Sequence, residues 1–179
     1  MQKERAKVAT ILLIVGRLTL AAIFLFAGYA KLQPQAAMHW SSASVKTSLA
    51  MFAMQVDSYQ MLPPAGVSFV AHTLPPFEIF LGLWLLSGIA LPVSSVISTL
   101  LIAGFFSAMV RSYALHLGIN CGCFGTPEQL GAKTLIRDGS LLALSLAVTI
   151  GAFVIRRRRG AGRFPEAAPA AMASQQTHG

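Results

Sequence analysis

Four long apolar segments constrain this chain more than any other feature of its sequence. Each is close to the roughly 20 apolar residues that a helix needs to cross a bilayer, and together they cover about residues 8–31, 67–91, 93–117 and 135–155. One such segment is also consistent with a buried helix of a soluble protein. Four of them in 179 residues leave too little polar sequence to cover them. We therefore expect an all-α integral membrane protein, a four-helix bundle.

The composition excludes several other classes of protein. Only 11% of the residues are charged, whereas soluble domains carry about 25%, and the mean hydropathy is +0.64. An ordinary soluble enzyme, a disordered protein and a small secreted protein held by disulfides do not fit these values. The basic start of the first segment resembles a signal peptide, but Arg17 interrupts the apolar run, which continues to Leu32 without a convincing cleavage site. We interpret this segment as a retained span.

The positive charges predict how the chain is oriented. The formal net charge is +8, and the arms at residues 1–7 and 156–179 hold three and five Lys or Arg residues. Four spans place both arms on one side, which the positive-inside rule makes cytoplasmic. We expect a bacterial inner-membrane protein with a membrane domain over 8–155, outward connections at 33–64 and 118–133, and a disordered basic tail. The arginines anchor this orientation among membrane lipids, and we expect no nucleic-acid partner.

The first outward connection has a helical pattern of its own. Apolar residues recur at three- and four-residue steps over residues 38–59, which indicates an amphipathic helix on the outer membrane surface between spans 1 and 2. Trp40 and Tyr59 are aromatic residues suited to such an interface. The segment ends at Pro63-Pro64.

The second outward connection carries the two cysteines of the chain. Cys121 and Cys123 are separated by one glycine in Cys121-Gly122-Cys123-Phe124-Gly125. The following Thr126-Pro127-Glu128-Gln129 has the pattern of a helix start, with Thr126 as the N-cap. A helix N-terminus so near would favour the thiolate of Cys123. We therefore expect Cys123 to be the attacking thiolate and Cys121 to resolve the mixed disulfide.

Three interpretations of this pair stay open. In the first, the sulfurs cycle between dithiol and disulfide, because a ring closed over one residue is strained and an outward loop meets an oxidising compartment. In the second, both thiolates and His116 bind Cu(I), helped by the outer methionines Met38, Met51, Met54 and Met61. In the third, the cysteines form an inert structural disulfide or are two thiols with no role, although so short a loop gives a disulfide little entropic stabilisation. A non-catalytic assembly factor is a further alternative.

Charged residues within and beside the spans are a second group of candidates, because a charge in a bilayer is costly to bury. Arg17 and Lys31 share one helical face with Gly28, which would let another helix pack closely. Arg111 and Arg137 lie at the ends of the spans that flank the cysteine loop and would add positive potential there.

The second span contains His72 and Glu78, separated by Pro75-Pro76, which must kink or break a helix. If the helix is continuous, Glu78 lies about 16 Å deep and could pair with Arg17. If the span begins at the prolines, Glu78 lies near the outer surface and close to Lys31. Either a structural salt bridge holds the helices in register, or these groups exchange protons while the thiols are oxidised or reduced.

Taken together, these residues resemble the methylamine-utilisation MauE proteins, which are grouped with DoxX-like membrane proteins. The similarity covers roughly residues 8–155. It rests on Arg17 with Gly28-Tyr29-Ala30-Lys31-Leu32, Tyr59-Gln60-Met61-Leu62-Pro63, Pro75-Pro76-Phe77-Glu78, Gly82-Leu83-Trp84-Leu85-Leu86-Ser87-Gly88, Cys121-Gly122-Cys123-Phe124-Gly125 and Arg137-Asp138.

The resemblance implies a thiol-disulfide oxidoreductase that works with a thioredoxin-like periplasmic protein. It also implies a role in the maturation of disulfide-containing clients, in that family the small subunit of methylamine dehydrogenase. One dithiol does not carry electrons across a bilayer by itself, so a second acceptor is needed, either a quinone in the bundle or another protein. Arg17, His72 and Glu78 are the candidates for lining a quinone pocket.

Overall fold

The computed structural model describes residues 2–33, 41–119 and 129–161, and its regular elements are five helices. They are α1 (Gln2–Leu32), α2 (Ser42–Ser58), α3 (Pro64–Ser87), α4 (Leu91–Ala114) and α5 (Ala132–Ala161). All except α2 are long and apolar enough to cross a membrane. The predicted all-α membrane fold is therefore confirmed, and α2 is the helix expected between the first two spans.

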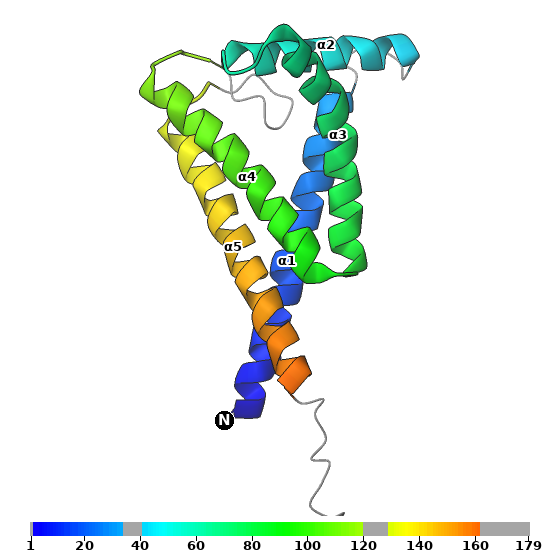
Figure 1. Cartoon of the computed structure of the whole chain (residues 1–179), viewed down its shortest axis with the longest axis vertical. Coiled ribbons are helices and arrows are strands. Elements are labelled where there is room, and N and C mark those ends of the chain that lie inside the picture. Colours follow the sequence, from blue (N-terminus) through cyan, green and yellow to red (C-terminus); the bar gives the residue numbers. More distant parts are fainter. Residues whose placement is uncertain (1, 34–40, 120–128, 162–179) are drawn as a thin grey trace, which may run out of the picture.

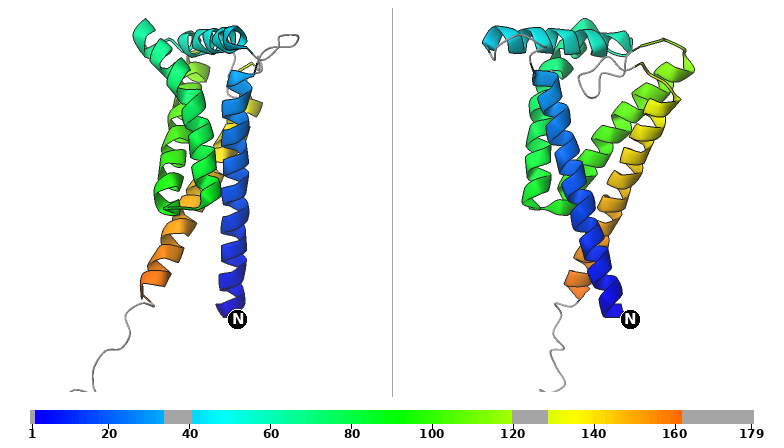
Figure 2. Two further views of the ribbon diagram at one scale, coloured as in Figure 1. Left: turned by 90° about the vertical axis from the view of Figure 1, so that its right-hand side faces the viewer. Right: turned by 180° about the vertical axis from the view of Figure 1, so that it is seen from behind.

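The four long helices form two pairs that splay apart (Figure 1). The first pair is α1 with α3, and the second is α4 with α5. The pairs meet near the N-terminus and separate toward α2, which lies across the opposite end (Figure 2). We call these the terminal end and the α2 end. The start of α1 and the end of α5 both lie at the terminal end, so the two basic arms leave the bundle on one side (Figures 1 and 2).

The observed helix bounds differ from the expected ones by a few residues. The turn between α3 and α4 uses left-handed backbone at Gly88, with φ of 69°, and at Ala90, with φ of 48°. The last helix, α5, continues to Ala161 and so extends beyond the expected boundary at residue 155. The disordered tail stays a prediction, because residues 162–179 lie outside the described residues.

The α1–α3 contact is close because glycines remove side chains from it. A Cβ built on Gly28 would lie 2.8 Å from the carbonyl oxygen of Pro75 and 2.7 Å from Cγ1 of Ile79. Real Cβ atoms do not approach other atoms so closely, which means that only glycine fits here. The prediction that Gly28 permits close helix packing is confirmed.

The α4–α5 contact uses small hydroxyl side chains instead. The Thr99 hydroxyl lies 2.7 Å from Oγ of Ser145 and 2.9 Å from Oγ1 of Thr149. Small hydroxyl side chains let two helices approach closely, and the hydroxyl groups form hydrogen bonds with one another in apolar surroundings. The α1–α3 pair therefore packs through glycine, and the α4–α5 pair packs through small hydroxyl side chains. Neither kind of contact fills the space between the two pairs at the α2 end.

Candidate functional site

A buried ion pair joins α1 to α3 near the α2 end. Nζ of Lys31 lies 2.8 Å from Oε2 and 2.9 Å from Oε1 of Glu78, and the two side chains are only 2% and 5% exposed. Lys31 comes from the last turn of α1, and Glu78 lies shortly after the two prolines of α3. A carboxylate and an ammonium so far from water persist only when paired, so each charge requires the other.

Both sequence hypotheses for Glu78 were partly wrong. α3 is continuous from Pro64 to Ser87, so Pro75-Pro76 do not break the helix. The partner of Glu78 is nevertheless Lys31 and not Arg17. The reason lies in the register of the two helices, because Gly28 meets the turn of α3 that contains Pro75 and so brings the end of α1 beside Glu78.

Lys31 also connects these two helices to α2. Its Nζ lies 5.5 Å from the ring centroid of Phe52, within the range of a cation–π interaction. It also contacts the Ala27 carbonyl at 3.4 Å. Nearby, the Ser48 hydroxyl donates a hydrogen bond to the Gln33 carbonyl at 3.0 Å. One buried ammonium therefore contacts groups from α1, α2 and α3.

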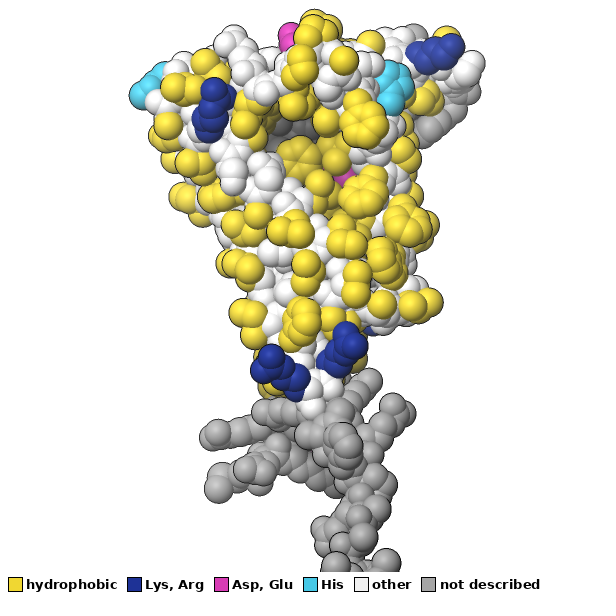
Figure 3. All heavy atoms as spheres, viewed as in Figure 1, with side chains coloured by type: hydrophobic (Ala, Val, Ile, Leu, Met, Phe, Trp, Pro, Cys, Tyr) yellow, Lys and Arg dark blue, Asp and Glu magenta, His cyan; other side chains and the backbone are white. Residues whose placement is uncertain are grey.

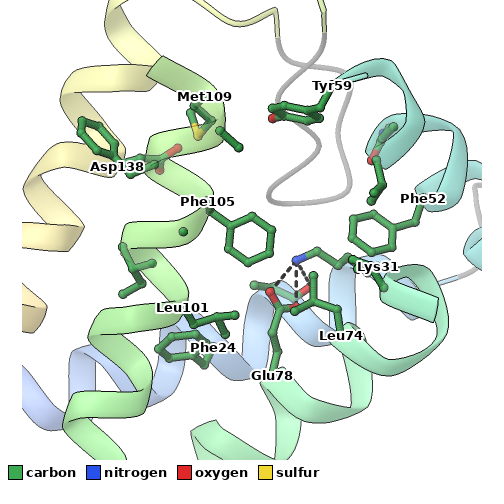
Figure 4. Close-up of a pocket in the computed structure, with 18 of the residues that line it drawn as sticks. Phe24, Lys31, Phe52, Tyr59, Leu74, Glu78, Leu101, Phe105, Met109 and Asp138 are labelled. Atoms are coloured by element: carbon green, nitrogen blue, oxygen red, sulfur yellow. Dashed lines mark hydrogen bonds and ion pairs between the residues drawn. The ribbon is translucent and has the colours of Figure 1, made fainter. Parts of the chain in front are cut away.

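The ion pair forms part of the wall of a cavity of about 470 Å³ between the two helix pairs. This volume falls within the roughly 300–1,000 Å³ typical of small-molecule sites. Figure 3 shows the hollow below α2, surrounded by apolar side chains. Figure 4 shows side chains from α1, α2, α3 and α4 around the ion pair, and those nearest to it include Phe24, Phe52, Leu74, Leu101 and Phe105.

A second carboxylate reaches the cavity from the opposite wall. Asp138 on α5 is 7% exposed and pairs with its neighbour Arg137, whose Nε lies 3.1 Å from Oδ1. We expected Arg137 to add positive potential at the cysteine loop, but its charge is paired with that of Asp138. Both carboxylates facing the cavity, Glu78 and Asp138, have a cation of their own, so these two pairs add no net charge.

Other predicted residues lie away from the cavity wall. His72 is exposed on a different face of α3 from Glu78, with its Nδ1 2.8 Å from the Ser68 carbonyl oxygen. Arg111 and His116 are exposed at the end of α4 and just beyond it. The structure therefore brings Lys31 and Glu78 together but does not bring His72, Arg111 or His116 to them.

Arg17 lies toward the terminal end, about 21 Å along α1 from Lys31. Its guanidinium sits against Gly88, where a Cβ would overlap it. Its Nε is buried without a hydrogen-bond partner in the part of the chain that is described. Arg17 therefore does not pair with Glu78 and does not line the cavity beside the Lys31–Glu78 pair.

Cys121 and Cys123 lie outside the described residues, but the two ends of their loop do not. The Leu130 amide donates a hydrogen bond to the Ile119 carbonyl at 2.9 Å, so the loop leaves and returns at one place on the α2 end. Its anchors continue into α4 and α5, which supply Met109 and other residues to the opposite cavity wall.

The predicted helix start at Thr126 lies outside the described residues. α5 begins at Ala132, and Gln129 precedes the helix, where its carbonyl accepts a bond from the Thr134 hydroxyl at 3.3 Å. Gln129 and Leu130 lie outside any helix, so the described residues give no support to the argument that a helix N-terminus activates Cys123.

Copper receives no structural support from the described residues. Among them, no group of three His, Cys, Asp or Glu side chains could hold a metal ion. The cysteines and Met38 lie outside that part of the chain, whereas Met51, Met54 and Met61 are partly or largely exposed.

The comparisons with known proteins gave one match. A family model described as methylamine utilisation protein MauE matches residues 9–151 of the chain. No curated protein and no solved structure matches it significantly. The matched segment extends from α1 into α5 and includes the Lys31–Glu78 and Arg137–Asp138 ion pairs, the cavity and the cysteine loop.

Proposed function

This chain belongs to the methylamine utilisation protein MauE family of membrane proteins, and from that premise we propose that it is a thiol-disulfide redox protein of the bacterial inner membrane. Cys121 and Cys123 exchange electrons with a thioredoxin-like periplasmic protein. The exchange supports the maturation of disulfide-containing clients.

The single observation that carries this proposal is the position of the loop that holds the cysteines. Its anchors, Ile119 and Leu130, lie at the α2 end, opposite the end where both basic arms leave the bundle. Arg156 and Arg157 are exposed at the terminal end. Because positive residues favour the cytoplasmic side, the terminal end faces the cytoplasm and the loop faces the periplasm. Disulfide chemistry belongs in that compartment.

The reaction is a thiol-disulfide exchange. A thiolate of the pair attacks the disulfide of the partner and forms a mixed disulfide, and the second cysteine then displaces the partner. The partner gains two electrons and two protons as a dithiol, while Cys121 and Cys123 join in a disulfide. The reverse sequence reduces the pair.

Substitution of the cysteines tests this proposal. The double variant Cys121→Ser/Cys123→Ser should lose exchange with an added thioredoxin-like protein, because no thiol remains. One single variant should trap the mixed disulfide, detectable by mass spectrometry on a non-reducing gel band. Normal client maturation in cells that carry the double variant would contradict the proposal, as would copper that co-purifies with the reduced protein and is lost with the cysteines.

The orientation of the chain in the membrane is tested separately, in the variant that carries both Cys121→Ser and Cys123→Ser. Thr47→Cys introduces a thiol on the exposed face of α2, and Arg157→Cys is its matched control at the terminal end. In intact spheroplasts a membrane-impermeant alkylating reagent should label Thr47→Cys, and it should label Arg157→Cys only after the membrane is opened. The reverse pattern would place the cysteine loop in the cytoplasm and would overturn the proposal.

A further inference from the structure

The cavity below α2 combines apolar walls with polar groups that are already neutralised. Its two carboxylates have cations of their own, Glu78 through Lys31 and Asp138 through Arg137. An ionic ligand would have to compete with the partner that each of these groups already has, and separation of the buried Lys31–Glu78 pair would cost several kcal/mol. The cavity is therefore suited to an uncharged molecule.

The walls beside the ion pair are aromatic. Phe24 from α1, Phe52 from α2 and Phe105 from α4 surround the Lys31–Glu78 pair (Figure 4). Aromatic side chains pack on flat conjugated rings in offset or edge-to-face arrangements. The 3.4 Å contact from Lys31 to the Ala27 carbonyl is longer than a typical hydrogen bond, so a ligand carbonyl can replace it at little cost. A flat ring that carries carbonyl oxygens matches these walls.

The cavity is open on the side of the bundle rather than toward the terminal end. The hollow in Figure 3 lies within an apolar face of the molecule, between the diverging helix pairs. Leu100 on α4 lines the cavity and is also 67% exposed, so it forms part of the rim. In a membrane such a rim meets lipid, and a molecule dissolved in the bilayer reaches the cavity without crossing water.

We propose that this cavity binds the ring of a membrane quinone, with the isoprenoid tail leaving through the lateral opening. The proposal rests on the proposed function, which requires a second redox partner for the dithiol. In the step, the two S–H bonds of Cys121 and Cys123 break and an S–S bond forms. The quinone gains two electrons and two protons, and two O–H bonds form as it becomes the hydroquinone.

The same helices carry the cavity wall and the cysteine loop. α4 and α5 supply Met109 and Asp138 to the wall, and the loop anchors lie just outside these helices, with Ile119 five residues after the end of α4 and Leu130 two residues before the start of α5. A phospholipid fits this site less well, because its phosphate needs a cation and both cations here are already paired with carboxylates.

Of the residues expected to line a quinone pocket, Glu78 lines this cavity, whereas Arg17 and His72 do not.

Filling the cavity tests this inference without disturbing the ion pairs. Gly104 lines the cavity, and a Cβ built on it would meet no atom within 4 Å. Gly104→Phe should therefore place a ring in the space without displacing the walls. Val110→Phe is the matched control, because Val110 lies on the same helix, is 43% exposed and is not part of the cavity wall. Gly104→Leu is a second, smaller filling variant in case the larger one does not fold.

The probe is decylubiquinone, titrated into the full chain in phosphatidylcholine nanodiscs and followed by calorimetry. Wild type and Val110→Phe should bind it equally, and Gly104→Phe should bind it at least tenfold more weakly while keeping the unfolding temperature of the wild type. The inference would be overturned if wild type did not bind decylubiquinone or if Gly104→Phe bound it as well as wild type does. It would also be overturned if native mass spectrometry found only phospholipid bound to the protein.

A second measurement separates this inference from the proposed function. The reduced protein, mixed with decylubiquinone, should form one hydroquinone for each disulfide, as followed by absorbance and thiol titration. Exchange with the thioredoxin-like protein but no quinone binding would overturn the inference and leave the proposed function intact. If the double-Ser variant still bound quinone and the wild type showed no thiol exchange, the proposed function would be overturned. The inference that the cavity binds a quinone would then still stand.

Discussion

Two cations on one face of α1 have different environments at the two ends of the bundle. At the α2 end, Lys31 is buried, holds Glu78 through both carboxylate oxygens and contacts the Phe52 ring. Toward the terminal end, Arg17 is partly exposed and lies against Gly88, with no carboxylate paired to it among the described residues. The comparison shows that a shared helical face does not give a shared role, because the role depends on what the other helices bring to that face.

The largest expected effect is at the α2 end. Glu78→Leu leaves the ammonium of Lys31 buried without its carboxylate, and we expect a loss of about 3–5 kcal/mol in the free energy of unfolding. The double variant Lys31→Met/Glu78→Leu removes both charges and should recover most of that loss. Denaturant unfolding in detergent, followed by circular dichroism, measures both values. Equal destabilisation of the single and double variants would show that the pair does not act as a unit.

A smaller effect is expected where α1 approaches α3. Gly28→Leu places a side chain against the Pro75 backbone, and we expect a loss of about 1–3 kcal/mol, because overpacking at a backbone contact cannot relax easily. Gly104→Leu is the control, since its side chain enters open space. The same unfolding assay should leave the control near the wild-type value. If both glycines tolerate leucine equally, the close approach that brings Lys31 beside Glu78 is not what fixes the register.

The smallest effect is expected for Arg17. Arg17→Gln removes a cation that has no ion-pair partner among the described residues, and we expect the free energy of unfolding to change by no more than about 0.5 kcal/mol. Thermal unfolding of wild type and variant in the same detergent measures this difference. A loss as large as that of Glu78→Leu would end the contrast between the two ends of α1.

The fold followed from local sequence features. Apolar length predicted the four spans, and three- and four-residue spacing predicted the helix between the first two, because both properties belong to contiguous residues. Gly28 was also identified correctly, because it shares a helical face with Arg17 and Lys31, where another helix was expected to pack.

The site was predicted only in part, and the errors have physical causes. Pro75-Pro76 left open whether the helix continues, and α3 in fact runs through both residues, where α1 packs closely against it. The Thr126 pattern suggested a helix start; Thr126 lies outside the described residues, and within them α5 begins at Ala132, where the chain has already turned back beside Ile119. Asp138 received no role in the sequence analysis, although a carboxylate in the first turns of an apolar helix was the available signal.

The sequence by itself determined that this chain has four segments long and apolar enough to cross a membrane and that Lys31 and Glu78 lie within or beside them. Only the tertiary structure decided that these two residues meet, that Arg17 is left apart, and that a cavity opens between diverging helix pairs. Hydropathy and periodicity act over neighbouring residues, whereas pairing depends on where helices cross and in which register. Residues 47 positions apart, such as Lys31 and Glu78, acquire a relation only through that packing.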